Sequence, residues 1–293
     1  MRVPDQKHHY IPEFYLEQWA GPYGRLIEFC RRHNNLVRAR QTHPDGTGYS
    51  RGLYTIQGAP PHLKDIFESE FMSVRDGRAA ESLRLMVDDH LIPGGNLRVA
   101  WAQFMMSLWY RTPEGVARSS EMIRKHYEEE NLEPMRERYA AERRSNDADT
   151  LEEYLKTTAP LITSRTTIVH LMDIIGSRKV TETIMSMRWY VVRMNDLRFS
   201  ILTSDRPVVM TNGIAYDHSH IVMPLSPQRI FVAANTEPEV EKLKALSRDG
   251  TIAAVLNDRV VRQARKFVYG VDYRQLRFVG NRLGEKAACS PFE

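Results

Sequence analysis

The chain of 293 residues contains little cysteine. Its two cysteines, Cys30 and Cys289, lie near opposite ends and form no CxxC pair. This spacing excludes a zinc site built from cysteine pairs, whereas a single bridge between the two thiols stays open. Low cysteine content in a chain of this length is typical of proteins from the reducing cytoplasm.

Long hydrophobic runs are also absent. Apolar stretches such as residues 252–256 are far too short to cross a bilayer. The segment Met1–Tyr10 is polar and lacks the apolar core of a signal peptide. We therefore expect a soluble, cytoplasmic protein with no membrane partner.

No charge of one sign dominates. The formal net charge of +4 comes from 41 lysines and arginines against 37 acidic residues. Such a small excess permits a nucleic acid or nucleotide as partner without requiring one. Hydrophobic residues make up 42% of the chain and charged residues 27%, a composition typical of a folded protein rather than a disordered one.

Several catalytic and nucleotide-binding motifs are missing. The chain contains no GxxxxGK[ST], GxGxxG, HExxH or GxSxG pattern and no internal repeat. These absences argue against a P-loop hydrolase, a Rossmann dinucleotide-binding protein and a standard serine hydrolase.

The pattern of apolar residues predicts an α+β protein. We expect a mainly helical N-terminal and middle region packed on a mostly antiparallel C-terminal sheet, in one globular domain spanning residues 1–293. Strands are predicted by short β-rich runs at 25–31, 36–40, 188–194, 198–203, 208–211, 220–223, 229–233 and 267–270. Helical spacing covers 63–74, 97–112, 161–175 and 237–264, the last divided at Asp249-Gly250.

A run of charged residues occupies positions 121–144, with EEE at 128–130 and RERYAAERR at 136–144. Alternating charges on a helix are typical of a solvated face with i,i+4 ion pairs. We therefore expect a protruding charged helical hairpin within residues 113–160. The alternative is that the helix at 121–144 contacts a protein partner.

The first candidate for chemistry is His8-His9-Tyr10. Adjacent residues of an extended chain point to opposite faces, so only one of the two histidines can enter a given pocket. The following aromatic residues indicate that this segment docks on the core. We assign His9 as a catalytic base or metal ligand and Tyr10 as a substrate-binding residue. The structural alternative is a histidine that is hydrogen-bonded within a packed segment.

The second candidate is TSDRP at 203–207, directly after a predicted strand. A strand can direct polar side chains into a cleft at its end, so Asp205 is assigned as a catalytic residue. The structural alternative is equally consistent with the pattern, because Ser-Asp before X-Pro also forms turns.

The helices supply the remaining candidates. Gln103 and Arg111 lie eight residues apart and share roughly one side of a helix. We assign Gln103 as a catalytic residue and Arg111 as a phosphate clamp. The structural alternative is a polar stripe that faces water. Two glutamates, Glu68 and Glu70, lie on the first predicted helix. Glu70 is nearer the apolar stripe, which consists of Phe67, Phe71 and Val74. Glu70 is therefore assigned as a catalytic residue or ligand.

The string HHYIPEFYL at 8–16 and TSDRPVV at 203–209 resemble the family called domain of unknown function 4238. Weaker matches to this family are Gly52-Leu53-Tyr54, PLSP at 224–227, Asn257 and Val268-Tyr269. The resemblance extends from about His8 to Tyr269. It implies an intracellular protein with His9 and Asp205 as family features, and it implies no reaction.

Two hypotheses follow. The first is an enzyme that acts on a phosphate-containing or nucleic-acid substrate. A nuclease that depends on a divalent metal is one example of such an enzyme. It requires His9, Glu70, Arg111 and Asp205 to meet at one cavity. The second is a binding or regulatory protein without chemistry, in which these residues stabilise the fold. A bound ion is not specified by the sequence.

Overall fold

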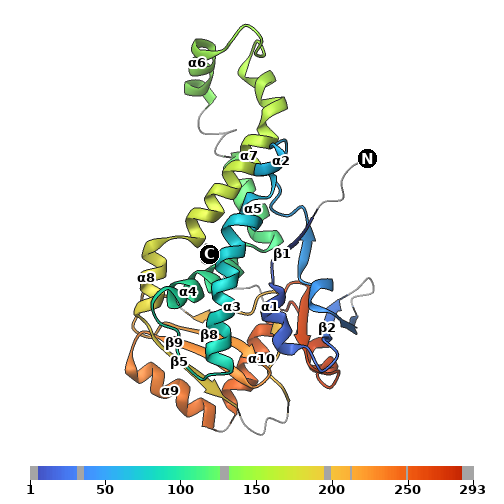
Figure 1. Ribbon diagram of the computed structural model, residues 1–293, viewed down its shortest axis with the longest axis vertical. Helices are drawn as coiled ribbons and strands as arrows, with labels where there is room; N and C mark the ends of the chain where they lie inside the picture. The colour runs from blue at the N-terminus through green and yellow to red at the C-terminus, as the bar shows by residue number, and fades with distance from the viewer. Residues whose placement is uncertain are drawn as a thin grey trace.

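A computed structural model describes residues 6–31, 36–125, 132–194, 199–211, 213–248 and 250–285. The predicted α+β class is confirmed: helices and antiparallel sheets occur together (Figure 1). The predicted turn at 32–35, part of the charged run at 126–131, Asp249 and Cys289 lie outside the described residues. Among the described residues, no helix is long and apolar enough to cross a membrane.

One four-stranded sheet has the order β5-β9-β8-β7, with all neighbours antiparallel. Its strands are β5 (Arg188–Arg193), β7 (Val209–Thr211), β8 (His220–Ser226) and β9 (Arg229–Ala234). The side chains of β9 alternate between two cores. Ile230 and Val232 join one core, and Phe231 joins the other. A strand that is buried on both faces in this way reads as a continuous apolar run.

Helices cover both faces of this sheet. On one face lie α9 (Glu237–Arg248) and α10 (Thr251–Gln263). Across the other face lie α3 (Ser73–Val87), α4 (Gly95–Tyr110) and α8 (Arg178–Ser186). Trp101 of α4 contacts Phe231 edge-on, with ring centres 5.9 Å apart. The apolar face predicted for this helix is therefore part of the core.

The second four-stranded sheet joins the two ends of the chain, in the order β3-β2-β10-β6. Its strands are β2 (Leu26–Arg31), β3 (Val37–Thr42), β6 (Thr203–Ser204) and β10 (Phe267–Gly270). The hairpin of β2 and β3 was predicted. Its pairing with β10 was not, because the apolar pattern of a strand does not specify its partner. The predicted N-terminal hairpin therefore forms one sheet with strands from the C-terminal part of the chain.

The first residues of the chain form a short pair, β1 (Lys7–His9) with β4 (Tyr49–Arg51). They are followed by α1 (Glu13–Leu16) and a 3-10 turn at Glu17–Trp19. Tyr15 and Trp19 are fully buried, and their polar atoms bond to residues of the C-terminal half. The predicted docking of this segment on the core is confirmed.

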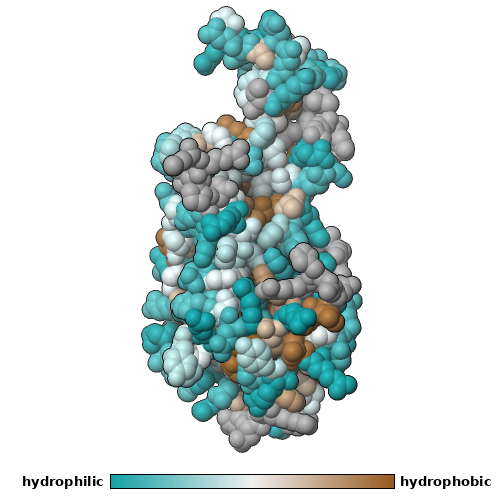
Figure 2. Space-filling model, turned by 90° about the vertical axis from the view of Figure 1, so that its right-hand side faces the viewer, coloured by the Kyte–Doolittle hydropathy of each residue, from teal (hydrophilic) through white to brown (hydrophobic). Residues whose placement is uncertain are grey.

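The remaining helices build the upper part of the molecule. They are α2 (Pro61–Lys64), a π-helical turn (Phe67–Met72), α5 (Pro113–Lys125), α6 (Leu132–Glu142) and α7 (Leu151–Ile175). Figure 1 shows α6 and the first turns of α7 standing beyond the body. In Figure 2 this part is almost entirely hydrophilic.

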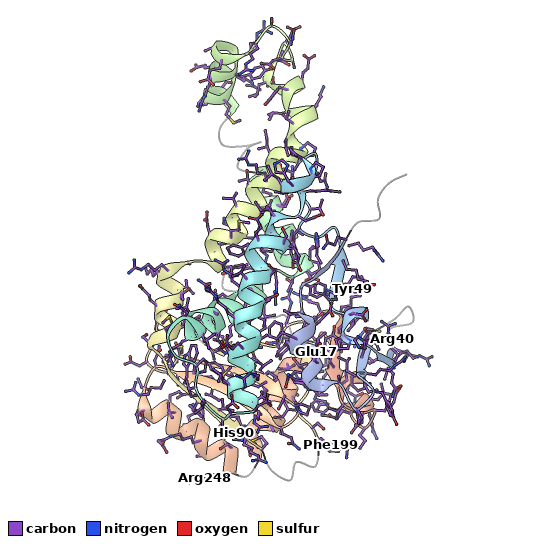
Figure 3. The ribbon with its side chains drawn as sticks, in the orientation of Figure 1. Glu17, Arg40, Tyr49, His90, Phe199 and Arg248 are labelled. Carbon is purple, nitrogen blue, oxygen red and sulfur yellow. The ribbon has the colours of Figure 1, made fainter. Side chains whose placement is uncertain are left out.

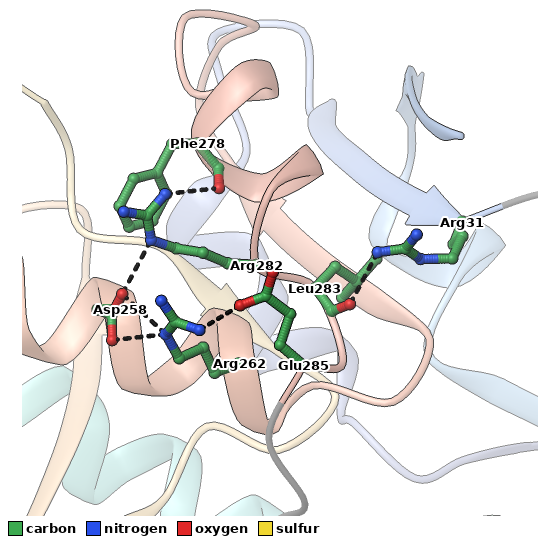
Figure 4. Close-up of polar contacts among 7 residues, drawn as sticks. All are labelled: Arg31, Asp258, Arg262, Phe278, Arg282, Leu283 and Glu285. Carbon is green, nitrogen blue, oxygen red and sulfur yellow. Dashed lines mark hydrogen bonds and ion pairs between the residues drawn. The ribbon is translucent and has the colours of Figure 1, made fainter. Parts of the chain in front are cut away.

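A short 3-10 turn (Pro44–Gly46) and α11 (Leu276–Gly280) complete the fold. A group of polar contacts, here called the clamp, holds the C-terminal end of the described chain (Figure 4). Asp258 of α10 accepts hydrogen bonds from Arg262 and Arg282, each Nε lying 2.9 Å from a carboxylate oxygen. Arg31 of β2 donates to the carbonyl of Leu283 at 3.0 Å. The clamp thus holds α11 against both α10 and the sheet.

Candidate functional site

Four distant segments meet around a hollow of about 260 Å³ that is open to solvent. One wall follows the β1–β4 pair, a second is the start of α5, and the others are the loop after β6 and the turn before β10 (Figure 3 labels Tyr49 in the first wall). The lining residues are Tyr10, Tyr49, Ser50, Thr112, Pro113, Glu114, Asp205, Arg206 and Lys266. Two of them, Tyr10 and Asp205, were assigned from the sequence.

Gly48 fixes the position of Tyr10. The carbonyl of Gly48 accepts hydrogen bonds from the backbone N–H groups of Tyr10 and Ile11, at 2.9 and 3.1 Å. Gly48 has φ of 66°, and a Cβ there would lie 3.2 Å from the carbonyl oxygen of Ile11. Only glycine therefore fits without strain. The result is that Tyr10 turns toward the hollow from the end of β1.

The Tyr10 side chain is buried, with 4% of its surface exposed. The Tyr10 side chain is one of those that line the hollow. Burial raises the pKa of the Tyr10 hydroxyl, and the negative charges of Asp205 and Glu114 raise it further. Tyr10 therefore keeps its proton and is available to donate it in a hydrogen bond to a bound molecule.

Tyr15 provides a contrast five residues further along. Its hydroxyl lies 2.7 Å from Thr203 Oγ1 and donates to the carbonyl of Pro224 at 2.9 Å. These bonds connect the N-terminal segment to both four-stranded sheets. The Tyr15 hydroxyl thus has a structural role in the fold.

Asp205 is held by backbone groups far from it in sequence. Its carboxylate accepts hydrogen bonds from the N–H groups of Arg265, Lys266 and Phe267, at 3.0, 2.7 and 3.1 Å. The local turn bond expected of Ser-Asp-X-Pro comes from Ser204, whose Oγ accepts a hydrogen bond from the N–H of Arg206 at 3.1 Å. Asp205 instead binds the chain before β10. Asp205 consequently fixes the turn that carries Lys266.

Burial sets the acidity of Asp205. Its side chain is 4% exposed, and burial raises the pKa to about 6, although the three N–H donors oppose the shift. The nearby charge of Glu114 also raises this pKa. A carboxyl group that titrates near pH 6 can exchange a proton under physiological conditions.

Two basic side chains complete the hollow. Arg206 approaches Glu114, with 3.5 Å between Nη2 and Oε2. Lys266 is exposed, and its Nζ lies 4.9 Å from the centre of the Phe267 ring. The sequence placed Arg206 beside Asp205 but provided no reason to select it, and Lys266 stood in no motif.

The beginning of α5 forms the remaining wall. Thr112 Oγ1 accepts a hydrogen bond from the N–H of Gly115 at 3.1 Å and so caps the helix. A Cβ at Gly115 would lie 2.4 Å from the carbonyl oxygen of Tyr110. The glycine therefore allows α5 to start directly after α4, which places the helix N-terminus at the hollow.

Arg111 does not line the hollow but belongs to a buried ionic cluster beside it. This cluster consists of His8, Tyr54, Asp65, Glu68, Asp76 and Arg111. Nη1 of Arg111 bonds to both carboxylate oxygens of Asp76, at 3.1 and 2.9 Å. Its Nε and Nη2 are buried and have no hydrogen-bond partner within the described ranges. Arg111 is 1% exposed, so it is built into the fold.

The interior histidine is His8, not the assigned His9. His8 is fully buried, accepts a hydrogen bond from the N–H of Tyr54 at 3.0 Å, and stacks on the Tyr54 ring. Nδ1 of His9 instead lies 3.4 Å from Glu13, and burial lowers the pKa of His9. His9 is not among the residues that line the hollow. The alternation of a strand predicted one interior histidine but not which one.

The helical candidates also separate. Glu70 is exposed, and Glu68 is the glutamate that faces Arg111 and Asp76. Burial raises the pKa of Glu68 to about 7, with Arg111 opposing the shift. Gln103 accepts a hydrogen bond from Arg75 at 3.2 Å and forms none with Arg111 among the described residues. The enzyme hypothesis required His9, Glu70, Arg111 and Asp205 at one cavity, but only Asp205 of these four lines the hollow. Gln103 does not line it either.

A buried polar row lies next to Tyr10. Glu28 is fully buried and receives two hydrogen bonds from Arg40, at 2.7 and 3.1 Å. Thr47 donates to Glu28 at 2.6 Å and lies 3.0 Å from the Tyr269 hydroxyl. The paired Glu28 is therefore neutralised within the fold (Figure 3 shows Arg40 on the outer side).

Metal ligands do not gather in the described part of the chain. No group of three or more His, Cys, Asp or Glu side chains there is arranged to hold a metal ion. The described residues therefore give no support to the divalent metal that we considered from the sequence.

Comparison with known proteins gives one match. A family model described as protein of unknown function (DUF4238) matches residues 7–273. The match includes both strings that carried the resemblance, at 8–16 and 203–209, and so confirms it. No curated protein and no solved structure matches the chain.

Proposed function

The chain belongs to the DUF4238 family of proteins of unknown function, and we propose that it is a cytoplasmic enzyme that acts on a phosphate-containing substrate in the hollow. The observation that carries the proposal is the convergence of a protonated tyrosine hydroxyl, a carboxyl group with a pKa of about 6 and two basic side chains on one opening.

Three features favour a phosphate group as the ligand. Arg206 offers a planar fork of donors that suits phosphate oxygens. Lys266, on the turn before β10, adds a second positive charge to the lining of the hollow. The N-terminus of the thirteen-residue helix α5 adds the positive end of the helix dipole. Tyr10 donates a hydrogen bond to the same ligand.

Asp205 is the group for proton transfer. An acid–base catalyst is most effective when its pKa lies near the working pH, and the pKa of about 6 meets this condition. One of its oxygens accepts two backbone hydrogen bonds and the other accepts one. The second oxygen therefore keeps more capacity for a ligand or water.

The size of the hollow limits what enters it. Its volume of about 260 Å³ lies below the usual range for a whole drug-sized ligand, roughly 300–1,000 Å³. A phosphate with part of an attached group fits, and the remainder of the substrate extends into solvent. A nucleotide or a nucleic acid meets this description, so the nuclease of the sequence hypothesis is one form of the proposal.

The test uses the purified full-length chain. Inorganic phosphate binding is followed by calorimetry, and turnover is followed with chromogenic phosphate mono- and diesters. Lys266→Ala should weaken phosphate binding about tenfold, because one charged hydrogen bond is lost. Arg265→Ala is the matched control, since Arg265 is exposed and adjacent but does not line the hollow. Equal affinities for the two variants would contradict the proposal.

Tyr10→Phe gives a second, independent variant. Phenylalanine keeps the ring that packs in the core, so the substitution should leave the thermal stability nearly unchanged. Turnover should fall as the hydrogen bond to the substrate disappears. A variant that loses stability but keeps full turnover would argue against a role for Tyr10 in the site.

A second candidate function is ligand binding without chemistry. It is favoured by the engagement of Asp205 with three backbone N–H groups and of Arg111 with Asp76, which are structural roles. In that case phosphate binds without turnover, and His9→Ala mainly lowers stability, by roughly 1–3 kcal/mol. Contact of a protein partner with residues 121–144 stays a prediction under either function.

A further inference from the structure

Glu114 is the lining residue that the proposed function leaves without a role. It lies in the first turn of α5, and 53% of its side chain is exposed. Its Oε2 is 3.5 Å from Nη2 of Arg206, at the outer limit of a hydrogen bond. The Nε of Arg206 is buried and has no hydrogen-bond partner among the residues that the structure describes. Glu114 thus engages the guanidinium weakly and leaves its donors only partly used.

We propose that the Glu114 carboxylate occupies the place of the ligand's anionic group at Arg206, so that a phosphate must displace it to bind. The inference rests on the proposed function and adds a residue that limits affinity. Both carboxylate and phosphate fit the same fork of donors. Because Glu114 is half exposed, its side chain can turn into solvent when the ligand takes Arg206.

The charge of Glu114 also reaches the other groups of the hollow. It is among the causes that raise the pKa of Asp205 and of Tyr10, after burial in both cases. The charged and titratable groups that line the hollow with it are Tyr10, Tyr49, Asp205, Arg206 and Lys266. Glu114 is therefore electrostatically coupled to the proton-transfer group as well as to the basic side chain.

A purely structural role for Glu114 makes a different prediction. A glutamate in the first turn of a helix interacts favourably with the helix dipole. If that were its whole contribution, Glu114→Gln would slightly lower the melting temperature and leave ligand affinity unchanged. Affinity and pH dependence therefore separate the two roles.

The experiment compares Glu114→Gln with Glu121→Gln in the full chain, with inorganic phosphate as the probe. Glu121 lies on the same helix, is similarly exposed, and pairs with Arg124 at 2.7 Å outside the hollow. Glu114→Gln should bind phosphate about threefold more tightly or better, a gain expected from removing one partly exposed ion pair. Glu121→Gln should bind like the unmodified protein.

The pH dependence supplies the second readout. Without the negative charge of Glu114, the pKa of Asp205 falls, so the acidic limb of the pH–rate profile should move to lower pH in Glu114→Gln only. If phosphate binds and Lys266→Ala weakens it, but both glutamine variants behave alike, the inference about Glu114 is wrong while the proposed function stands. If phosphate does not bind the unmodified chain, both are overturned.

Discussion

At the scale of single residues, the fold treats chemically identical side chains differently. Glu68 and Glu70 are two positions apart on a π-helical turn, yet Glu68 faces Arg111 and Asp76 whereas Glu70 is exposed. Burial of the Glu68 carboxyl raises its pKa from 4.5 to about 7. At a pH between these two pKa values, Glu68 is therefore protonated in the folded protein and ionised in the unfolded chain.

We predict that Glu68→Gln stabilises the protein at high pH. Because the pKa of Glu68 is raised in the folded state, its contribution to stability is fully present below about pH 4.5 and falls as pH rises toward 7. Glutamine resembles the neutral acid, so the variant should gain on the order of 1–3 kcal/mol at pH 8 and little at pH 4. Urea denaturation at both pH values measures this.

Glu70→Gln is the control for that comparison, because the exposed carboxyl should show no such gain. An equal effect of the two substitutions at pH 8 would mean that burial of Glu68 does not cause the shift. The π-helical turn also explains why the sequence favoured the wrong glutamate. A wider turn changes the angle between successive side chains, so a stripe extrapolated at α-helical spacing points to the wrong residue.

At the scale of elements, buried polar pairs join segments that the apolar core alone does not align. Arg111 at the end of α4 meets Asp76 of α3, with 1% and 21% of their side chains exposed. Asn257 of α10 accepts a hydrogen bond from the N–H of Leu202 at 2.7 Å and so holds the approach to β6. Asn257, one of the residues that match the family, therefore has a structural role.

The pair between α3 and α4 should be costly to break. Asp76→Asn leaves the Arg111 guanidinium buried without its countercharge, and we expect a loss of about 3 kcal/mol. Asp89→Asn on the same chain segment is the control, because the Asp89–Arg84 pair is exposed and should contribute less than about 1 kcal/mol. Chemical denaturation of both variants would show the difference, and similar losses would refute the buried-pair account.

At the scale of the whole molecule, the body and the projecting helices are stabilised differently. The body has apolar side chains on both faces of a sheet. Helix α6 has no buried residue among those described for it. It is held by ion pairs such as Arg136–Glu152 and by contact of Tyr139 with Tyr154, whose ring centres are 5.2 Å apart. The charged hairpin expected at 113–160 corresponds in part to this projection (Figure 1).

Hydrogen exchange should reveal this difference. Exposed ion pairs contribute little, so α6 should open locally without global unfolding. We expect its amides to exchange roughly 100-fold faster than those of α10, whose apolar face is buried against the sheet. Mass spectrometry of peptides from both helices measures the rates. Protection of α6 equal to that of α10 would show that the projection is part of the cooperative core.

The amino-acid sequence by itself determined the elements whose pattern is local. The strand at 267–270 and the division of the C-terminal helices at Asp249-Gly250 follow from apolar spacing and a turn signal. The sequence also selected Asp205, because a polar residue at a strand end is a local feature, and Tyr10, as part of the string His8-His9-Tyr10. These predictions needed no knowledge of which segments become neighbours.

Only the tertiary structure decided which groups share the hollow. The pairing of β2 with β10 and the capture of residues 265–267 by Asp205 bring Tyr10, Glu114, Arg206 and Lys266 together. The same contacts leave His9, Glu70 and Gln103 elsewhere. The physical reason is that burial and non-local pairing minimise the free energy of the whole chain, whereas a spacing pattern constrains only the side chains of one element.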